Sequence, residues 1–231
     1  MNIQDSDNYK IDIIIEARMS SSRLPGKVLL PVIDKPLLLL MVERLKNTNL
    51  ISDIIIATTE NESDDVIVDL AQKEEIPFYR GSEKDVLGRV LKTAQSFGTN
   101  LIVEITGDNP LADPQLVDDL VKCFLKKEND FDIISTDMGY YNKNESITFP
   151  IGLGGKVFKT ELLKEISLKT NHATDREHVV NYILKNTEIY KCHNFIAKGL
   201  YKRPEIRLTM DYEEDYKLIK KIYESLYKKN N

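Results

Sequence analysis

Short apolar runs alternate with segments of helical periodicity through the first half of this 231-residue chain. Residues 11–15, 53–58 and 101–106 are apolar at most positions, which is typical of strands buried on both faces. Such strands, separated by helices, predict a mainly parallel sheet that is covered on both sides and joined by right-handed crossovers. Ligands of these sheets bind at the carboxyl ends of the strands. The loops to search therefore follow Glu16, Thr58, Tyr79 and Thr106.

The pattern along the rest of the chain completes a single α/β domain. Helices are expected at 36–46, 64–73, 84–97, 114–127, 160–168, 176–185 and 213–227, the first with Pro36 in its first turn. Further strands are expected at 76–79, 131–135, 152–158, 189–195 and 205–209. Residues 136–150 are expected to form a loop, and the lysine-rich end at 227–231 is expected to fray.

Charge and cysteine content exclude several classes of protein. Lys and Arg number 32 and Asp and Glu number 37, so the formal net charge is −5. This balance argues against a general binder of nucleic acid or of anionic membranes, because such proteins need a basic surface. Cys123 and Cys192 form no CxxC pair, which disfavours a disulfide framework or a zinc site. A reducing cytoplasm is the expected location.

No segment is expected to insert into a membrane. The most apolar window, 28–42, is interrupted by two prolines and two charged residues. It falls short of the roughly 20 apolar residues that span a bilayer. The first ten residues carry two aspartates and no apolar stretch, so they do not resemble a signal peptide.

The loop after the first strand, residues 17–27, is the strongest local feature and is called the basic loop below. It reads ARMSSSRLPGK, and no acidic residue occurs from 17 to 33. Arg18, Arg23 and Lys27 suit a polyphosphate, since guanidinium groups bind phosphate oxygens in pairs and lysine supplies a mobile charge. A solvated basic turn is the alternative. Neither a Walker loop nor a GxGxxG fingerprint is present, which argues against a P-loop NTPase or a dinucleotide-dependent oxidoreductase.

Two aspartates are candidate ligands of Mg²⁺. Asp108 follows the strand 101–106 within the sequence TGDNP, and Asp211 follows the expected strand 205–209. Mg²⁺ commonly takes one or two carboxylates together with phosphate oxygens and water. An aspartate in a turn or at a helix cap is the alternative for Asp108. The acids at 213–215 are expected to favour the dipole of the last helix instead.

Six segments together resemble the cytidylyltransferase-like family. They read ARMSSSRLPGKVL, ATTENESDD, FYRGSEKDVLGR, ITGDNPLADPQLVD, REHVVNYI and RLTMDYEEDYKLI. Their order and spacing are most similar to the spore coat polysaccharide biosynthesis protein F group, a relative of the CMP-KDO synthetases and of the acylneuraminate cytidylyltransferases. The resemblance covers residues 11–228.

The resemblance implies a GT-A-like nucleotidyltransferase fold with three α/β/α layers and a mainly parallel mixed sheet. It also implies transfer of CMP from CTP to an acidic sugar or related anionic acceptor, with release of pyrophosphate, for surface-glycan synthesis. Mg²⁺ is the implied cofactor and a homodimer the implied assembly. Residues 11–135 would bind the nucleotide, 136–205 the acceptor and the second subunit, and 206–228 would complete the metal site.

Residue roles follow from the matching motifs. The resemblance places Ala17, Arg18 and Ser22 in the nucleotide loop, and it makes Arg23, Lys27 and Asp108 the catalytic set, which also binds the nucleotide. Asp108 and Asp211 would hold the metal. The implied base and ribose pocket consists of Thr58, Arg80, Gly81 and Ser82.

The chain also departs from the family pattern. Glu16 stands where Gln is usual, and Glu104 where the most similar group has Arg. The family stretch GLDVEVF reads GLGGKVF, so that Gly154 and Lys156 replace two acids. The loss of two carboxylates and the gain of Lys156 favour an anionic acceptor. Loss of activity is the alternative.

Two further features have an open interpretation. His178, in the REH motif, is a candidate contact for the acceptor or for a second subunit, or else a structural histidine. Tyr140 and Tyr141 are candidates for a lid that stacks on a sugar, or else cover a core edge. Two other functions stay open for the whole chain: a nucleotidyltransferase that uses another nucleotide and a phosphorylated acceptor, and a catalytically silent nucleotide-binding scaffold.

Overall fold

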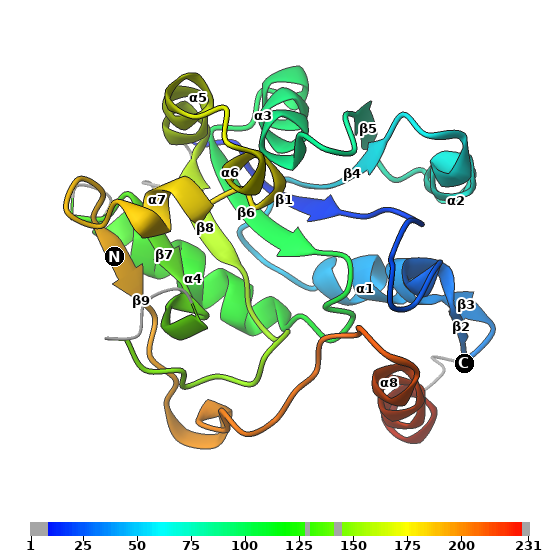
Figure 1. The fold of residues 1–231 in the computed structure, drawn as a ribbon. Helices are drawn as coiled ribbons and strands as arrows, with labels where there is room; N and C mark the ends of the chain where they lie inside the picture. Colours follow the sequence, from blue (N-terminus) through cyan, green and yellow to red (C-terminus); the bar gives the residue numbers. More distant parts are fainter. Residues whose placement is uncertain (1–8, 128–129, 141–144, 228–231) are drawn as a thin grey trace.

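The computed structural model describes residues 9–127, 130–140 and 145–227, and its centre is a seven-stranded sheet (Figure 1). The strand order is β5-β4-β1-β6-β8-β7-β9. The strands are β1 (Ile11–Glu16), β4 (Asp53–Thr59), β5 (Phe78–Gly81), β6 (Leu101–Thr106), β7 (Ile133–Ser135), β8 (Lys156–Lys159) and β9 (Cys192–Asn194). β8 pairs antiparallel with β6 and β7, and the other neighbours pair parallel. The predicted mainly parallel, mixed sheet is confirmed.

Helices cover both faces of the sheet, because each central strand presents apolar side chains in both directions. Alternate residues of β1 show this: Ile13 and Ile15 belong to one core cluster, and Ile14 belongs to the other. One face packs against α1 (Leu37–Leu45), α2 (Asp65–Lys73) and α4 (Pro114–Lys126). The other packs against α3 (Val86–Phe97), α5 (Thr160–Lys169) and α7 (Asn181–Lys185), with α6 (Ala173–Glu177) beside α3. Figure 1 shows α3, α5 and α6 on one side of the sheet and α1 and α4 on the other.

The last helix, α8 (Glu213–Leu226), packs outside these layers against a small hairpin of β2 (Pro31–Val32) and β3 (Lys35–Pro36). Tyr223 lies in this contact and donates a hydrogen bond of 2.7 Å to the carbonyl oxygen of Pro110. Met210, fully buried in the same cluster, anchors the residues that precede the helix. Asp211 is thereby held beside the carboxyl end of β6.

The predicted strand at 205–209 is wrong. The segment makes one isolated bridge, between Ile151 and Arg207. Gly152 limits the pairing, because its φ of 87° turns the chain away, and a Cβ there would lie 2.6 Å from the backbone nitrogen of Thr209. The segment then passes Asp108, whose carbonyl oxygen accepts a 2.8 Å hydrogen bond from the nitrogen of Met210.

The predicted helix at 176–185 is also wrong as a single element. α6 ends at Glu177, and His178 has extended backbone angles, φ −115° and ψ 101°. Val179 and Val180, each 3% exposed, pack into the cluster around α3 and α5. Burial of these two β-branched side chains outweighs continuation of the helix, which restarts at Asn181.

The remaining differences concern the ends of elements. Because Pro36 pairs within the β2–β3 hairpin, α1 begins at Leu37, so the prediction that Pro36 lies in its first turn is wrong. The predicted strands at 76–79, 131–135, 152–158 and 189–195 are present with shifted ends. The expected fraying at 227–231 falls mostly outside the described residues. Across the described ranges, no helix combines the length and the apolar character that a bilayer crossing requires.

Candidate functional site

Two cavities meet at the carboxyl end of β6, where Thr106 and Asp108 line both. The first, called the basic-loop cavity, has a volume of about 390 Å³. It lies between the basic loop, α3 and the end of α6. The second, called the β8 cavity, has a volume of about 280 Å³ and is bounded by the start of β8 and the chain at 149–155. Two ligands bound in these cavities would meet near Asp108.

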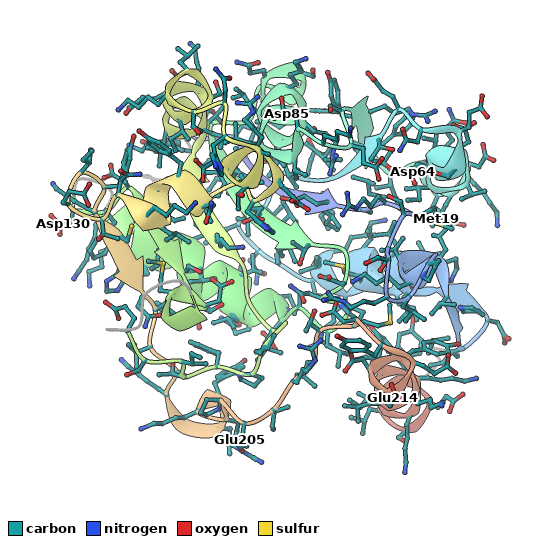
Figure 2. All side chains as sticks on the ribbon, in the orientation of Figure 1. Met19, Asp64, Asp85, Asp130, Glu205 and Glu214 are labelled. Atoms are coloured by element: carbon teal, nitrogen blue, oxygen red, sulfur yellow. The ribbon has the colours of Figure 1, made fainter. Side chains whose placement is uncertain are left out.

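The basic loop is folded back on itself and tied to its neighbours. Gly26, with φ 69°, donates a 2.9 Å backbone hydrogen bond to the carbonyl oxygen of Met19. The nitrogen of Met19 in turn donates to the carboxylate of buried Asp64 at 2.7 Å, and Figure 2 shows both residues at the same edge of the molecule. Glu83 accepts a hydrogen bond from Ser20 and lies 3.6 Å from Arg18. These contacts hold the loop open toward the cavity.

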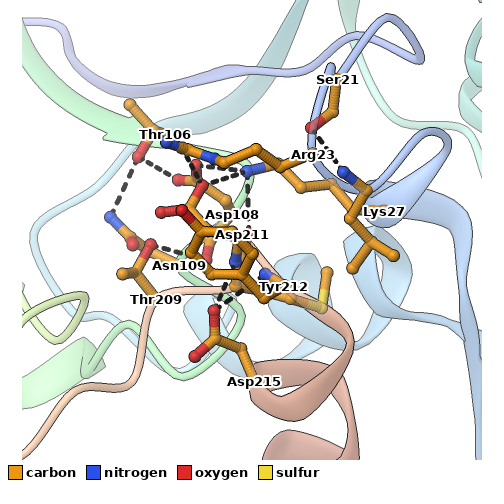
Figure 3. Close-up of polar contacts among 12 residues, drawn as sticks. Ser21, Arg23, Lys27, Thr106, Asp108, Asn109, Thr209, Asp211, Tyr212 and Asp215 are labelled. Carbon is orange, nitrogen blue, oxygen red and sulfur yellow. Dashed lines mark hydrogen bonds and ion pairs between the residues drawn. The ribbon is translucent and has the colours of Figure 1, made fainter.

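Asp108 and Asp211 converge on one lysine (Figure 3). The Nζ atom of Lys27 lies 2.7 Å from Oδ2 of Asp108 and 3.1 Å from Oδ1 of Asp211. Arg23 and Arg207 also bind the Asp211 carboxylate, at 2.5 and 2.7 Å. Although burial acts in the opposite direction, hydrogen bonds from Arg207, Lys27 and Arg23 lower the pKa of Asp211 to about 2. The cluster keeps this carboxylate ionised.

The backbone of β6 determines where Asp108 lies. The hydroxyl of Thr106 donates a 2.6 Å hydrogen bond to Oδ1 of Asp108, which fixes the carboxylate. Gly107 allows β6 to approach β1, because a Cβ at this position would lie 2.8 Å from the carbonyl oxygen of Glu16. The carboxylate of Asp108 therefore points toward Lys27 from a rigid strand end.

The donor set suits Mg²⁺ bound together with a phosphate. Oxygens of Asp108 and Asp211 face a common point, since both contact the ammonium group of Lys27. Within the described ranges, no group of three or more His, Cys, Asp or Glu side chains could hold a metal by itself. Mg²⁺ seldom needs such a cage, because it keeps waters and takes its remaining ligands from substrate phosphates.

The structure brings most of the predicted site residues together. Those lining the basic-loop cavity are Ala17, Arg18, Ser22, Arg23, Lys27, Asp108 and His178. Asp211 joins them through Lys27, and Lys156 lines the β8 cavity instead. The lid prediction for Tyr140 and Tyr141 stays a prediction, because Tyr141 lies outside the described residues.

The predicted base and ribose residues line neither cavity. They are Thr58, Arg80, Gly81 and Ser82. The guanidinium group of Arg80 binds the carbonyl oxygens of Thr59 and Asn61, at 2.8 and 2.9 Å, and Asp65 at 2.7 Å. Ser82 contributes its carbonyl oxygen to Arg89 at 2.6 Å. These contacts position the loop before α3, and a role in nucleotide binding stays a prediction.

Comparison with known proteins identifies the family. The cytidylyltransferase family model matches residues 13–231. The chain belongs to the cytidylyltransferase family. It is 33% identical over 216 residues to the spore coat polysaccharide biosynthesis protein SpsF of Bacillus subtilis, covering 91% of this chain and 85% of that relative. It is 39% identical over 209 residues to an uncharacterized protein of Methanocaldococcus jannaschii, covering 90% and 81%.

Structural comparison agrees with this family. A cytidylyltransferase from Leptospira borgpetersenii superposes with a TM-score of 0.87 at 32% identity, covering 95% of this chain and 89% of that one. The resemblance carried by the six sequence segments is thus confirmed, together with the α/β nucleotidyltransferase fold. The acceptor, the metal and the assembly stay predictions.

Two residues that depart from the family pattern pair with each other. Glu104 and Lys156 are direct partners in the antiparallel register of β6 and β8, with Oε2 and Nζ 3.0 Å apart. Asp137 lies 3.7 Å from the same ammonium group. The positive charge of Lys156, which favoured an anionic acceptor in the sequence, is therefore offset by two carboxylates. A Cβ built at Gly154 would overlap the hydroxyl of Thr136, which matches the absence of a side chain there.

Sequence reasoning missed the part of the basic-loop cavity that α3 builds. Arg89 is 3% exposed and lines the cavity together with Glu16. Burial, followed by the charge and a hydrogen bond of Glu104, raises the pKa of the Glu16 carboxyl well above its usual range. A signal for Arg89 is present in the sequence, because it interrupts an apolar helix face that includes Val86 and Val90.

Proposed function

We propose that this protein transfers CMP from CTP to a small acceptor and releases pyrophosphate. The observation that carries the proposal is the cluster of Arg23, Lys27, Asp108 and Asp211 at the junction of two cavities. The nucleotide would occupy the basic-loop cavity with its phosphates on Arg23 and Lys27. The acceptor would occupy the β8 cavity and reach the α-phosphorus near Asp108.

The chemistry needs position and charge more than a protein nucleophile. A hydroxyl oxygen of the acceptor forms a bond to the α-phosphorus and its proton passes to water, while the bond to pyrophosphate breaks and pyrophosphate leaves with the electron pair. Negative charge grows on the leaving group, and Arg23 and Lys27 are placed to stabilise it. Asp108 and Asp211 would hold Mg²⁺, which when bound supplies further charge stabilisation on the phosphates. Thr106 keeps Asp108 oriented for this role.

The proposal includes the chemical class of the acceptor. The β8 cavity offers the polar side chains of Asn109, Thr136 and Thr209 together with the backbone at 152–155. Hydroxyl and amide groups of this kind suit a polyhydroxylated molecule. We extend the proposal to an acidic sugar for surface-glycan synthesis, because SpsF of Bacillus subtilis carries a polysaccharide role in its name. His178, which lines the basic-loop cavity, would then contact the acid from the other side.

A homodimer belongs to the same proposal. Ile196 and Leu200 are 46% and 97% exposed, although both are large apolar side chains. They lie in the 136–205 part that the family resemblance assigns to subunit contacts. Light scattering of the purified protein would show a mass of twice 26.6 kDa if this holds, and a monomer would contradict it.

Release of pyrophosphate tests the function. The purified protein is incubated with Mg²⁺, each of the four ribonucleoside triphosphates and a panel of acidic and neutral sugars. We expect pyrophosphate only when CTP and an acceptor are both present, and loss of this signal in Lys27→Met. Lys35→Met, which removes a half-buried lysine of the β2–β3 hairpin away from both cavities, serves as the matched control. Release from another nucleotide, or nucleotide binding without turnover on any acceptor, would contradict the proposal.

A further inference from the structure

Asn109 lies directly after Asp108, at the junction of the two cavities. It lines the β8 cavity but not the basic-loop cavity. Its backbone is held on both sides, because its N–H donates to the carbonyl oxygen of Thr106 and its own carbonyl oxygen accepts from the nitrogen of Ala112, each at 3.0 Å. The side chain therefore projects from a fixed point of the backbone, at the end of the β8 cavity nearest Asp108.

The hydrogen bonds of Thr106 determine how the Asn109 amide group is turned (Figure 3). The single hydroxyl proton of Thr106 goes to Oδ1 of Asp108 at 2.6 Å. The hydroxyl oxygen can then only accept from Asn109, so the 3.0 Å contact comes from the NH₂ group at Nδ2. The amide oxygen, Oδ1, is the atom of this group that remains for another partner.

This amide oxygen is accessible and has no donor in the protein. Within the described ranges, no hydrogen bond reaches Oδ1 of Asn109, and it is not one of the buried side-chain atoms that lack a partner. Gly152 lies beside it, since a Cβ at that position would come within 2.9 Å of the oxygen. The glycine thus leaves the oxygen open to the β8 cavity, which both residues line.

A hydroxyl group of the acceptor is the partner that the reaction would bring to this oxygen. The acceptor has to present a hydroxyl oxygen to the α-phosphorus near Asp108, where the two cavities meet. The carboxylate of Asp108 is already engaged, because Oδ1 accepts from Thr106 and Oδ2 pairs with Lys27. A hydroxyl that donates its hydrogen to Oδ1 of Asn109 keeps its lone pairs free for the phosphorus.

We propose that Asn109 positions the attacking hydroxyl of the acceptor. Oδ1 accepts the hydrogen bond of this hydroxyl, while Nδ2 orients Thr106 and, through Thr106, the carboxylate of Asp108. The amide takes no proton in this step and fixes only the direction of attack. The proposal rests on the proposed function, because it needs an acceptor in the β8 cavity and a nucleotide in the basic-loop cavity.

Two uncharged variants of similar size separate the two ends of the amide. Asn109→Leu removes both ends, and Thr106→Val removes only the hydroxyl that Nδ2 contacts. Pyrophosphate release is measured with CTP, Mg²⁺ and the sugar that wild type uses best among acidic and neutral sugars. We expect Asn109→Leu to lower kcat about 100-fold, since misplacing a reacting group by about 1 Å can cost this much. In the Thr106→Val background, Asn109→Leu should still lower kcat by about tenfold, the effect of one lost hydrogen bond, because Oδ1 acts independently of Thr106.

Nucleotide binding gives a readout that a structural defect would change. By calorimetry, Asn109→Leu should bind CTP within about twofold of the wild-type affinity, because Asn109 does not line the basic-loop cavity. The loss should therefore appear in kcat and not in the KM for CTP. Asn47→Leu removes an exposed asparagine whose Nδ2 also donates to backbone carbonyl oxygens. It is the matched control, and both readouts should stay unchanged.

The outcomes separate this role from the proposed function. A wild-type kcat in Asn109→Leu overturns the role, and so does the absence of any further loss in the Thr106→Val background, because Asn109 would then act only on Asp108. A parallel loss of CTP affinity overturns it as well and assigns Asn109 to the nucleotide. Silence of folded wild-type protein on every sugar overturns the proposed function and this role with it. If Asn109→Leu does not fold, Asn109→Ala, which places a smaller side chain beside Gly152, makes the same comparison.

Discussion

Lys27 and Lys156 are both 9% exposed, and each lies between two carboxylates, but the carboxylate of Asp211 beside Lys27 also binds arginine side chains. Around Lys27, the guanidinium groups of Arg23 and Arg207 also bind Asp211. Three cations therefore contact the two aspartates that face Lys27, and Asp215 pairs with Arg207 from the other side. Lys27 can move to an arriving polyanion, because Asp211 remains paired with Arg23 and Arg207 after the lysine moves.

The surroundings of Lys156 are acidic instead. Glu104 and Asp137 contact its ammonium group, and Glu16 adds a third carboxyl beside Glu104. The positive charge of Lys156 is thus needed to neutralise these carboxyl groups, which the pairing of the strands brings together. A buried lysine between carboxylates can therefore bind a ligand only where other cations neutralise those carboxylates after the lysine has moved.

The largest expected effect is on Asp108. Asp108→Asn keeps the size of the side chain but removes the charge that faces Lys27 and the proposed metal. We expect CMP transfer to fall by about 10³-fold or more, in line with the loss of a main electrostatic group in an active site. The melting temperature should change little, because Lys27 keeps Asp211 and the carbonyl oxygen of Met210 as partners.

Asp69→Asn, an exposed change on α2, is the control for Asp108→Asn. Both variants are compared with wild type by pyrophosphate release in Mg²⁺ and by thermal unfolding. Near wild-type transfer by Asp108→Asn would remove Asp108 from the mechanism. A large drop in melting temperature would show that the cluster is structural.

A pair of lysine variants sharpens the comparison between the two regions. Lys27→Met should reduce transfer by about 10²-fold and cost little stability, since Arg23 and Arg207 remain on Asp211. Lys156→Met should cost about 3 kcal/mol of unfolding free energy, because it leaves Glu104 buried without its cation. The affinity for CTP should stay near the wild-type value in Lys156→Met.

Urea unfolding and calorimetric titration with CTP measure the two effects in parallel. The double variant Lys156→Met with Glu104→Gln is the control, and it should recover most of the lost stability because it removes the unpaired charge as well. Equal losses of unfolding free energy in Lys27→Met and Lys156→Met would contradict the conclusion that only Lys156 is needed for stability.

Most of the fold and half of the site follow from local sequence. The apolar strands at 11–15, 53–58 and 101–106 predict the parallel centre of the sheet, and the charge pattern of 17–27 predicts the basic loop. These features are local: periodicity and charge are visible within one segment. The short strands β7, β8 and β9 are less regular because long-range pairing, rather than their own pattern, defines their ends.

The rest of the site depends on contacts that no single segment contains. In the sequence, Lys156 is an added positive charge that favours an anionic acceptor, and only the register of β6 with β8 reveals Glu104 opposite it. Arg89 reads as part of a helix, and only its burial against β1 places it beside Glu16. The break at His178 likewise depends on tertiary burial of the two valines that follow it.

The smallest expected effect is on the pH dependence of stability, and it concerns Glu16 and Glu104 near Lys156. Burial and Glu104 hold the pKa of Glu16 well above its usual range in the folded protein. Well below the ordinary carboxyl pKa of about 4.3, folded and unfolded chains both hold the proton. As pH rises, the unfolded chain releases the proton while the folded pair keeps it, so wild type loses stability relative to Glu16→Gln. Urea unfolding across this range should show a variant advantage that is absent at low pH and grows toward neutral pH, to about 1 kcal/mol. A difference that does not depend on pH, or one matched by the exposed control Glu177→Gln, would mean that no proton is held between the two acids.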